Sequence, residues 1–221
     1  MSMQLVIPVK PFIYAKQRLA QLLDDSERAA LARVMLEDLL GTLSTCQRVE
    51  RVLLVGQPAA LGDIAERHGC EILAEKERGL SRAVGQAAVS LAQEGVSSML
   101  ILPGDVPLAA ADEVDTLIEQ HELGGGMTIV PDREGFGTNA LAVSLPCRVP
   151  FLFGRESFAA HCAAAREAGL AVRALDLPGI SFDVDLPEDL RDLMSYDSEA
   201  RTLAFLAARG LITRPQAQSA W

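Results

Sequence analysis

Basic residues are too few in this 221-residue sequence to give it a positive charge. Lys and Arg number 20 against 30 Asp and Glu, which leaves a formal net charge of −10 at pH 7. Such a protein repels DNA or RNA unless a basic patch overrides the field locally, and the sequence shows no such patch. A small anionic substrate stays compatible with this composition, because a divalent cation held between carboxylates inverts the local field.

Long apolar segments are absent as well. Although 49% of the residues are hydrophobic, no uninterrupted apolar run approaches the roughly 20 residues that a membrane-spanning helix needs. Met1 to Gln4 lead directly into an apolar stretch, without a basic region or a small-residue cleavage site. We therefore expect a soluble, cytoplasmic protein that does not bind a membrane.

Several signatures of catalysis and cofactor binding do not occur. The four cysteines are far apart and form no Cys-x-x-Cys pair, which counts against a zinc or redox motif. Neither Gly-x-x-x-x-Gly-Lys-Ser/Thr nor Gly-x-Gly-x-x-Gly is present, which counts against a P-loop kinase and a dinucleotide-binding dehydrogenase. A Gly-x-Ser-x-Gly elbow is also missing, so the sequence gives no sign of a serine hydrolase.

Short apolar runs alternate along the chain with segments of helical periodicity. Strands are expected at 5–9, 52–55, 71–73, 99–102, 127–130 and 139–144, and near Val172 and Phe182. Helices are expected at 26–43, before Gly69, at 79–94, 111–121 and 156–168, and from Pro187. The pattern predicts a single α/β domain with a mostly parallel sheet covered by helices on both faces, and a ligand site beyond the carboxyl ends of the strands.

Three acidic residues are expected at that edge. Asp105 follows the run 99–102, while Asp183 and Asp185 flank the end of the expected strand near Phe182. Residues i and i+2 of a strand share a face, so this pair can converge on one cation, and carboxylate oxygens suit Mg²⁺. The alternative is that Asp185 caps the helix beginning at Pro187. The pair alone leaves both interpretations open, whereas the addition of Asp105 favours a metal site.

Three cationic residues, Lys10, Lys16 and Arg18, lie in one loop directly after the first strand. At the mouth of the sheet they could neutralise a triphosphate and stabilise departing pyrophosphate. They could also be the solvated basic start of a helix, which spacing alone slightly favours.

Glycine turns occur at Gly135 to Asn139 and at Gly154 to Phe158. The second opens a helix whose free N–H groups, together with Ser157, could bind a phosphate or carboxylate. Most isolated turns of this kind are simple connections. His161 follows Ser157 by one helical turn, and a packed histidine is favoured there over a substrate contact.

Five motifs taken in order resemble one family. They are Ile7 to Pro11 with Ala15 to Leu19, Leu102 to Leu108, Gly137 to Leu141, Gly154 to Phe158, and Asp183 to Asp185 with Pro187 to Leu190. Over roughly residues 4 to 194 the chain is similar to the CofC/FbiD family of 2-phospho-L-lactate or phosphoenolpyruvate guanylyltransferases of deazaflavin coenzyme biosynthesis. The resemblance implies a GT-A-like, Rossmann-like nucleotidyltransferase fold for 1–194, with 195–221 as a C-terminal helix and tail that pack on the domain or on a partner subunit.

The resemblance also implies a division of the site. Catalysis would involve Asp105, Lys10, Lys16 and Arg18, and Mg²⁺ would be held by Asp105, Asp183 and Asp185. GTP would be bound by Pro8, Val9, Lys10, Gly79, Leu80, Ser81, Pro103 and Gly104. The phosphorylated carboxylic acid (2-phospho-L-lactate, phosphoenolpyruvate or 3-phospho-D-glycerate) would be bound by Thr138, Asn139, Gly154 and Ser157.

One residue departs from the family pattern: Ser81 stands where the family has asparagine, which weakens the assignment of guanine. Two other functions stay open. One is a related nucleotidyltransferase acting on a sugar phosphate or a molybdopterin-type acceptor, and the other is a non-catalytic nucleotide-binding regulator. A homodimer is a further expectation to test.

Overall fold

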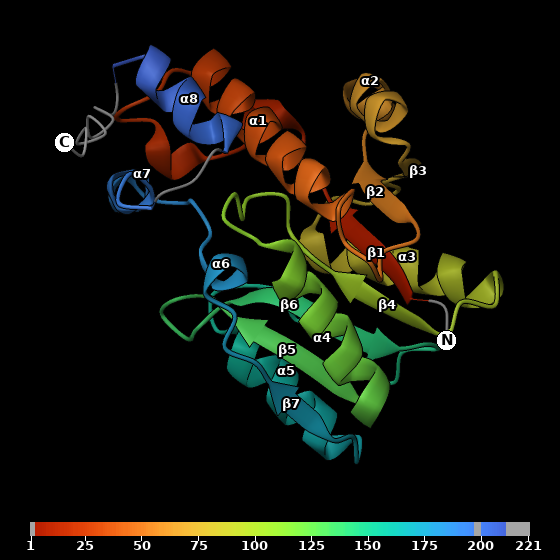
Figure 1. The fold of residues 1–221 in the computed structure, drawn as a ribbon. Helices are drawn as coiled ribbons and strands as arrows, with labels where there is room; N and C mark the ends of the chain where they lie inside the picture. Colours follow the sequence, from red (N-terminus) through yellow and green to blue (C-terminus); the bar gives the residue numbers. More distant parts are fainter. Residues whose placement is uncertain (1–2, 197–199, 211–221) are drawn as a thin grey trace.

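The computed structural model describes residues 3–196 and 200–210, which fold around one seven-stranded sheet (Figure 1). The strand order is β3-β2-β1-β4-β6-β5-β7. The strands are β1 (Met3–Pro8), β2 (Val52–Gly56), β3 (Glu71–Ala74), β4 (Ser98–Ile101), β5 (Met127–Pro131), β6 (Thr138–Ser144) and β7 (Val172–Ala174). Only β6 runs antiparallel to its neighbours, β4 and β5. The expected mostly parallel α/β architecture is therefore confirmed.

Helices cover both faces of the sheet (Figure 1). They are α1 (Asp25–Leu43), α2 (Pro58–His68), α3 (Leu80–Gln93), α4 (Ala111–Gly124), α5 (Ser157–Glu167), α6 (Pro178–Ser181), α7 (Pro187–Leu193) and α8 (Arg201–Ala208), with 3₁₀ turns η1 (Phe12–Tyr14) and η2 (Gln17–Leu19). None of the helices within the described ranges is long and apolar enough to cross a bilayer.

The alternation of side chains along β1 shows how the two faces are filled. Leu5 and Ile7 belong to a core with residues of α1, α2 and α4, whereas Val6 belongs to a core with residues of α3 and α5. Successive strand residues point to opposite faces, so a continuous apolar run is what a strand covered on both sides requires.

A third apolar cluster lies beside the sheet and includes residues from distant parts of the chain. Leu19 of η2, Phe182, Val184 and Leu206 of α8 are all buried in it, together with residues of α1 and α7. Helix α8 itself packs on α1, where the carboxylate of Asp38 accepts hydrogen bonds from the first turn of α8. This cluster connects the loop after β1 to the segment that carries Asp183 and Asp185.

The expected strand near Phe182 is wrong. Phe182 follows the short helix α6, and the segment 182–186 is irregular. Its backbone is held next to the loop that follows β4 by a hydrogen bond from the amide of Val184 to the carbonyl of Asp105, at 3.2 Å. The alternating sequence of this segment resembles a strand because Phe182 and Val184 are buried, but they are buried in the third cluster.

Candidate active site

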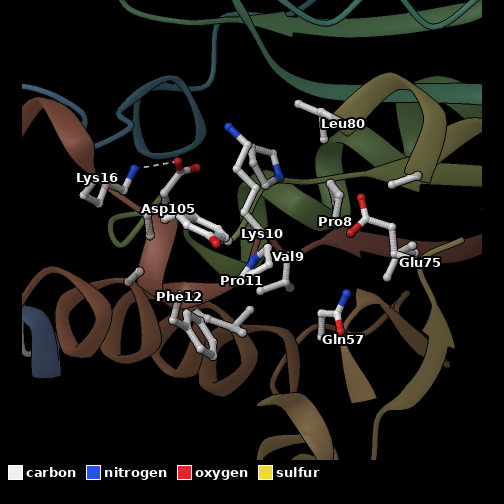
Figure 2. A pocket seen from close by; sticks show the side chains of 18 of the residues that line it. Pro8, Val9, Lys10, Pro11, Phe12, Lys16, Gln57, Glu75, Leu80 and Asp105 are labelled. Atoms are coloured by element: carbon white, nitrogen blue, oxygen red, sulfur yellow. Dashed lines mark hydrogen bonds and ion pairs between the residues drawn. The ribbon is translucent and has the colours of Figure 1, made fainter. Parts of the chain in front are cut away.

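A cavity of about 550 Å³ opens at the carboxyl ends of β1, β2, β3 and β4 (Figure 2). Parallel strands end together at one edge of a sheet, where their following loops enclose a ligand site. The wall includes the segment from Pro8 to Arg18 except Ile13, then Gln57, Glu75, Arg78, Gly79, Leu80, Pro103, Gly104, Asp105 and Asp185. Of the eight residues expected at the nucleotide, seven line this cavity, and Ser81 does not.

Close backbone packing holds the loop after β1 in place. The amide of Val9 donates to the carbonyl of Val55 at 2.8 Å, and a Cβ on Gly56 would lie 2.7 Å from the carbonyl oxygen of Val9. At Gly104, a Cβ would lie 3.1 Å from the side chain of Leu36 in α1. A larger residue at either position would therefore displace the wall of the cavity.

Lys16 lies between two of the predicted metal ligands. Its ammonium donates to Asp105 at 2.7 Å and to Asp185 at 2.9 Å, and its side chain is only 5% exposed (Figure 2 shows the contact with Asp105). Burial acts to lower the pKa of Lys16, but the charges of both carboxylates outweigh it and raise the pKa above its ordinary value. The guanidinium of Arg18 lies 3.6 Å from Asp185.

Asp183 is the third member of this acidic group. It accepts a hydrogen bond from the amide of Asn139 at 3.1 Å. Burial, followed by the negative charge of Asp105, raises the pKa of Asp183 to about 6. For Asp185, burial also acts to raise the pKa, but the positive charge of Lys16 outweighs it and the pKa is lowered. The structure thus brings the three predicted aspartates together, with more negative charge than one buried ammonium balances.

The capping alternative for Asp185 is wrong. The amides of Asp185 and Leu186 both donate to Asp189 Oδ2, at 2.8 Å and 2.6 Å, so Asp189 caps the start of α7. The side chain of Asp185 is engaged with Lys16 instead.

A divalent cation is only partly accommodated by this arrangement. Within 3–196 and 200–210, no three His, Cys, Asp or Glu side chains are grouped as ligands of one metal ion. The donor chemistry nevertheless fits Mg²⁺, because three carboxylates lie in one region, where burial, followed by the negative charge of Asp105, raises the pKa of Asp183. Oxygen ligands suited to Mg²⁺ are therefore present, and the ammonium of Lys16 lies between those of Asp105 and Asp185.

A second polar group forms beside the first, around Thr138 at the start of β6. The ring of His161 in α5 is fully buried, as expected for a packed histidine. Its Nε2 accepts from the amide of Leu152 at 2.8 Å, so its proton is on Nδ1, which donates to Thr138 Oγ1 at 3.1 Å. Burial lowers the pKa of His161 to about 4, which keeps the ring neutral. The hydroxyl proton of Thr138 is then free to be donated elsewhere.

The two glycine turns and helix α5 meet at this place. The amide of Phe158 donates to the carbonyl of Phe136 at 3.0 Å, and the amide of Ser157 to the carbonyl of Gly154 at 3.2 Å. The amide of Asn139 also donates to two carbonyls of α6, which puts β6 directly beside Asp183. Of the four residues expected to bind the acid, Asn139 thus contacts the acidic group, and none of the four, Thr138, Asn139, Gly154 and Ser157, belongs to the wall of the first cavity.

Ser81 lies between the two parts of the site. Its Oγ accepts from the amide of Phe153 at 3.1 Å, so it connects the start of α3 to the turn before α5.

Sequence reasoning missed Gln57, Glu75 and Arg78 in the cavity wall. Gln57 and Glu75 each follow directly after a strand, β2 and β3, so the same rule that selected Asp105 could have found them.

Comparison with known proteins identifies related sequences over most of the chain. The sequence model of the family described as "Guanylyl transferase CofC like" matches residues 3–221. A phosphoenolpyruvate guanylyltransferase of Roseiflexus castenholzii is 40% identical over 190 residues, which are 86% of this chain and 87% of that protein. A 2-phospho-L-lactate guanylyltransferase of Methanothermobacter thermautotrophicus is 34% identical over 211 residues, 95% of this chain and 92% of that protein.

Solved structures show the same fold at low sequence identity. A protein of Desulfovibrio desulfuricans, described as a nucleotide-diphospho-sugar transferase, superposes with a TM-score of 0.76 at 17% identity and covers 95% of this chain and 96% of its own. A 4-diphosphocytidyl-2C-methyl-D-erythritol synthase has a TM-score of 0.62 at 14% identity, covering 87% of this chain and 96% of its own. The chain therefore has a GT-A-like nucleotidyltransferase fold.

Proposed function

Because this chain belongs to the family of guanylyl transferases like CofC, we propose that it transfers the GMP part of GTP to a small phosphorylated carboxylic acid and releases pyrophosphate. The main observation behind the proposal is the cavity at the carboxyl ends of the strands, whose wall contains cations from the segment after β1 together with Asp105 and Asp185. The relatives carry the names of two such acids, phosphoenolpyruvate and 2-phospho-L-lactate. The full-length family match favours this reaction over transfer to a sugar phosphate and over a non-catalytic regulator.

In the proposed reaction, a phosphate oxygen of the acid attacks the α-phosphorus of GTP in line, and pyrophosphate leaves from the opposite side. Such an oxygen is already nucleophilic, so no general base is needed. The obstacle is the approach of two anions, because unit charges 4 Å apart repel by roughly 4 kcal/mol at an effective dielectric constant of about 20. Lys10, Lys16 and Arg18 supply positive charge in the cavity wall for this purpose.

Mg²⁺ is part of the proposal. Asp105, Asp183 and Asp185 are the residues that would hold it: Asp105 and Asp185 both bind the ammonium of Lys16, and the negative charges of these two carboxylates also act on Asp183. When bound there, the metal ion would offset phosphate charge and help to orient both substrates. Arg18 has a 69% exposed side chain, so it is free to turn from Asp185 toward a phosphate.

The acid would bind where β6 and α5 meet. The hydroxyls of Thr138 and Ser157 would donate to its phosphate and carboxylate, beside the turn at Gly154, while the side chain of Asn139 and the amide of Ser157 already donate within the protein and would shape the site. Asn139 is the physical connection to the aspartates, because one of its hydrogen bonds goes to Asp183. In this proposal the two substrates would bind on either side of the acidic group.

The proposal extends to the biosynthetic pathway, the location in the cell and the binding partners. We place the enzyme in deazaflavin coenzyme biosynthesis and in the cytoplasm, with GTP and the acid as its partners and no role for nucleic acid or membranes. A homodimer is proposed as well, to be tested by light scattering of the purified protein.

The test is a pyrophosphate-release assay with GTP, Mg²⁺ and each of phosphoenolpyruvate, 2-phospho-L-lactate and 3-phospho-D-glycerate. We expect pyrophosphate with at least one acid and none without an acid, together with a guanylylated product of matching mass. Omission of Mg²⁺ is expected to stop the reaction. If no acid supports release, or if only a sugar phosphate does, the proposed function is wrong.

A further inference from the structure

Glu75 is an acidic residue in the cavity wall that the proposed chemistry does not use. It follows β3 directly and is partly buried. In Figure 2, Glu75 and Gln57 lie on the side of the cavity opposite Lys16 and Asp105. Within residues 3–196 and 200–210, the structure records no hydrogen bond or ion pair for its carboxylate. A carboxylate without a protein partner is thus presented to the cavity, away from the acidic group.

The backbone around Glu75 is held firmly. Its amide donates to the carbonyl of Gly56 at 3.1 Å, which extends the pairing of β3 with β2 by one residue. The side chain of Gln86 in α3 bonds the residues on both sides: it donates to the carbonyl of Ala74 at 2.8 Å and accepts from the amide of Lys76 at 3.0 Å. These contacts fix the position from which the carboxylate extends, as selective recognition requires.

The charges in the cavity orient a nucleotide. Three of the four cations in the described wall, Lys10, Lys16 and Arg18, lie in the segment after β1, with Lys16 next to Asp105, and the fourth is Arg78. A nucleoside triphosphate bound with its phosphates there directs its base away from them, toward the side formed by Leu80, Gln57 and Glu75 (Figure 2). The volume of about 550 Å³ is in the range of small-molecule sites.

We infer that Glu75 is the residue that selects guanine, accepting hydrogen bonds from N1–H and from the 2-amino group of the base. Guanine presents two adjacent donors on this edge, which match the two oxygens of one carboxylate. Adenine and cytosine present an acceptor nitrogen there, and uracil presents one donor between two carbonyl oxygens, so a carboxylate repels them. The inference rests on the proposed function and adds the residue that reads the base.

Glu75→Gln provides the test, because it changes the hydrogen-bonding pattern with little change in shape. An amide offers one acceptor and one donor, which match N1–H and the O2 oxygen of xanthine rather than the two donors of guanine. With phosphoenolpyruvate or 2-phospho-L-lactate as acceptor, we expect kcat/KM for GTP to fall roughly tenfold or more and kcat/KM for XTP to rise above the wild-type value.

Inosine triphosphate, which has N1–H but no 2-amino group, tests one hydrogen bond. The wild-type protein should prefer GTP over ITP by roughly tenfold, and Glu75→Gln should reduce this ratio to one or below. Glu77→Gln is the matched control, since Glu77 is exposed, lies 3.4 Å from Arg82 and is not in the cavity wall. That control should keep the wild-type preferences for GTP, ITP and XTP.

The outcomes separate this inference from the function on which it rests. A wild-type protein that transfers GMP, with a Glu75→Gln variant that keeps the full preference for GTP over ITP and XTP, overturns the role of Glu75 alone. A wild-type protein that transfers no nucleotide overturns both. Calorimetric titration of each variant with GTP and XTP gives a second measurement that does not depend on turnover, and the same inversion of preference is expected there.

Discussion

At the level of single residues, Lys16 shows how the protein keeps a charged group inside the site. Burial of an isolated ammonium is unfavourable, and here two carboxylates at 2.7 Å and 2.9 Å offset that penalty. Its backbone has a left-handed φ of 51°, which is unusual for a side chain other than glycine. Backbone strain of this kind is concentrated at functional sites, where the surrounding structure holds the residue in place.

Asp105→Asn tests the acidic group directly. We expect turnover to fall by roughly a hundredfold or more, because the site loses a charge that orients Lys16 and would hold Mg²⁺. The fold should survive, since Lys16 keeps its ion pair with Asp185. Pyrophosphate release measures the first effect and circular dichroism the second. Asp176→Asn, at an exposed position, is the control, and a wild-type rate for Asp105→Asn in excess Mg²⁺ would contradict the role.

His161→Asn tests the polar group around Thr138 through the pH dependence of stability. The pKa of His161 is lowered to about 4 in the folded protein, against an ordinary value of 6.5. The folded protein favours the neutral form of His161, and this contribution to the free energy of unfolding is complete above about pH 6.5. It is lost as the pH falls from 6.5 toward about 4. Between pH 7.5 and pH 5 this loss amounts to about 2 kcal/mol. Urea unfolding at both pH values should show a drop smaller by about that amount in the variant.

The same variant should also bind the acid more weakly, because Thr138 loses the partner that orients its hydroxyl. We expect KM for the acid to rise by roughly two- to tenfold with KM for GTP unchanged. His121→Asn is the matched control: His121 is buried and lies 3.3 Å from Thr128 in a comparable pair, but it belongs to α4 on the other face of the sheet. Equal effects of the two variants on KM would count against the positioning role of His161.

At the level of elements, local patterns predicted most of the sheet and its helices. The runs at 52–55 and 99–102 became buried central strands because a run that is apolar on both faces can only be buried between two helical layers. The segment around Phe182 misled the prediction because its alternation reflects burial in the third cluster and not strand pairing. A burial pattern indicates which residues are covered but does not identify what covers them.

For the site, the sequence predicted which residues lie at the edge of the sheet but not which side chains contact one another. The position of Asp105 after a strand indicated its place at the rim, and the cationic loop after β1 was expected at the same edge. The insertion of Lys16 between Asp105 and Asp185, and the contact of His161 with Thr138, join residues far apart in sequence. Such contacts depend on how the loops fold back, for which the spacing of residues carries no signal.

Leu206→Ala tests whether helix α8 supports the site. Leu206 is fully buried in the cluster that also contains Leu19 and Val184, which lie next to the cationic loop and to the aspartates. We expect the free energy of unfolding to fall by about 2–5 kcal/mol, as for other buried leucines, and the Mg²⁺ concentration for half-maximal activity to rise. Leu123→Ala, at a 71% exposed position in α4, should change neither. If Leu206→Ala loses stability but keeps the wild-type Mg²⁺ dependence, helix α8 does not support the site.

At the level of the whole molecule, one sheet carries both parts of the site. The cavity is built on β1 to β4, and the proposed acid site on β6 and α5, with β4 paired directly to β6. The net charge of −10 opposes two anionic substrates at long range, so binding depends on cations within the site. Because the strands that carry the two parts of the site pair directly with each other, stabilisation by one substrate should extend through the entire sheet.

Thermal unfolding with and without GTP tests this coupling. Because the strands belong to one sheet, we expect a single calorimetric transition that GTP and Mg²⁺ shift upward as a whole. At a GTP concentration 100 times its Kd the added stability is about 2.7 kcal/mol. ATP at the same concentration should give a smaller shift, and in Glu75→Gln the difference between the two nucleotides should shrink. Two transitions, of which GTP moves only one, would show instead that the cavity and the acid site unfold separately.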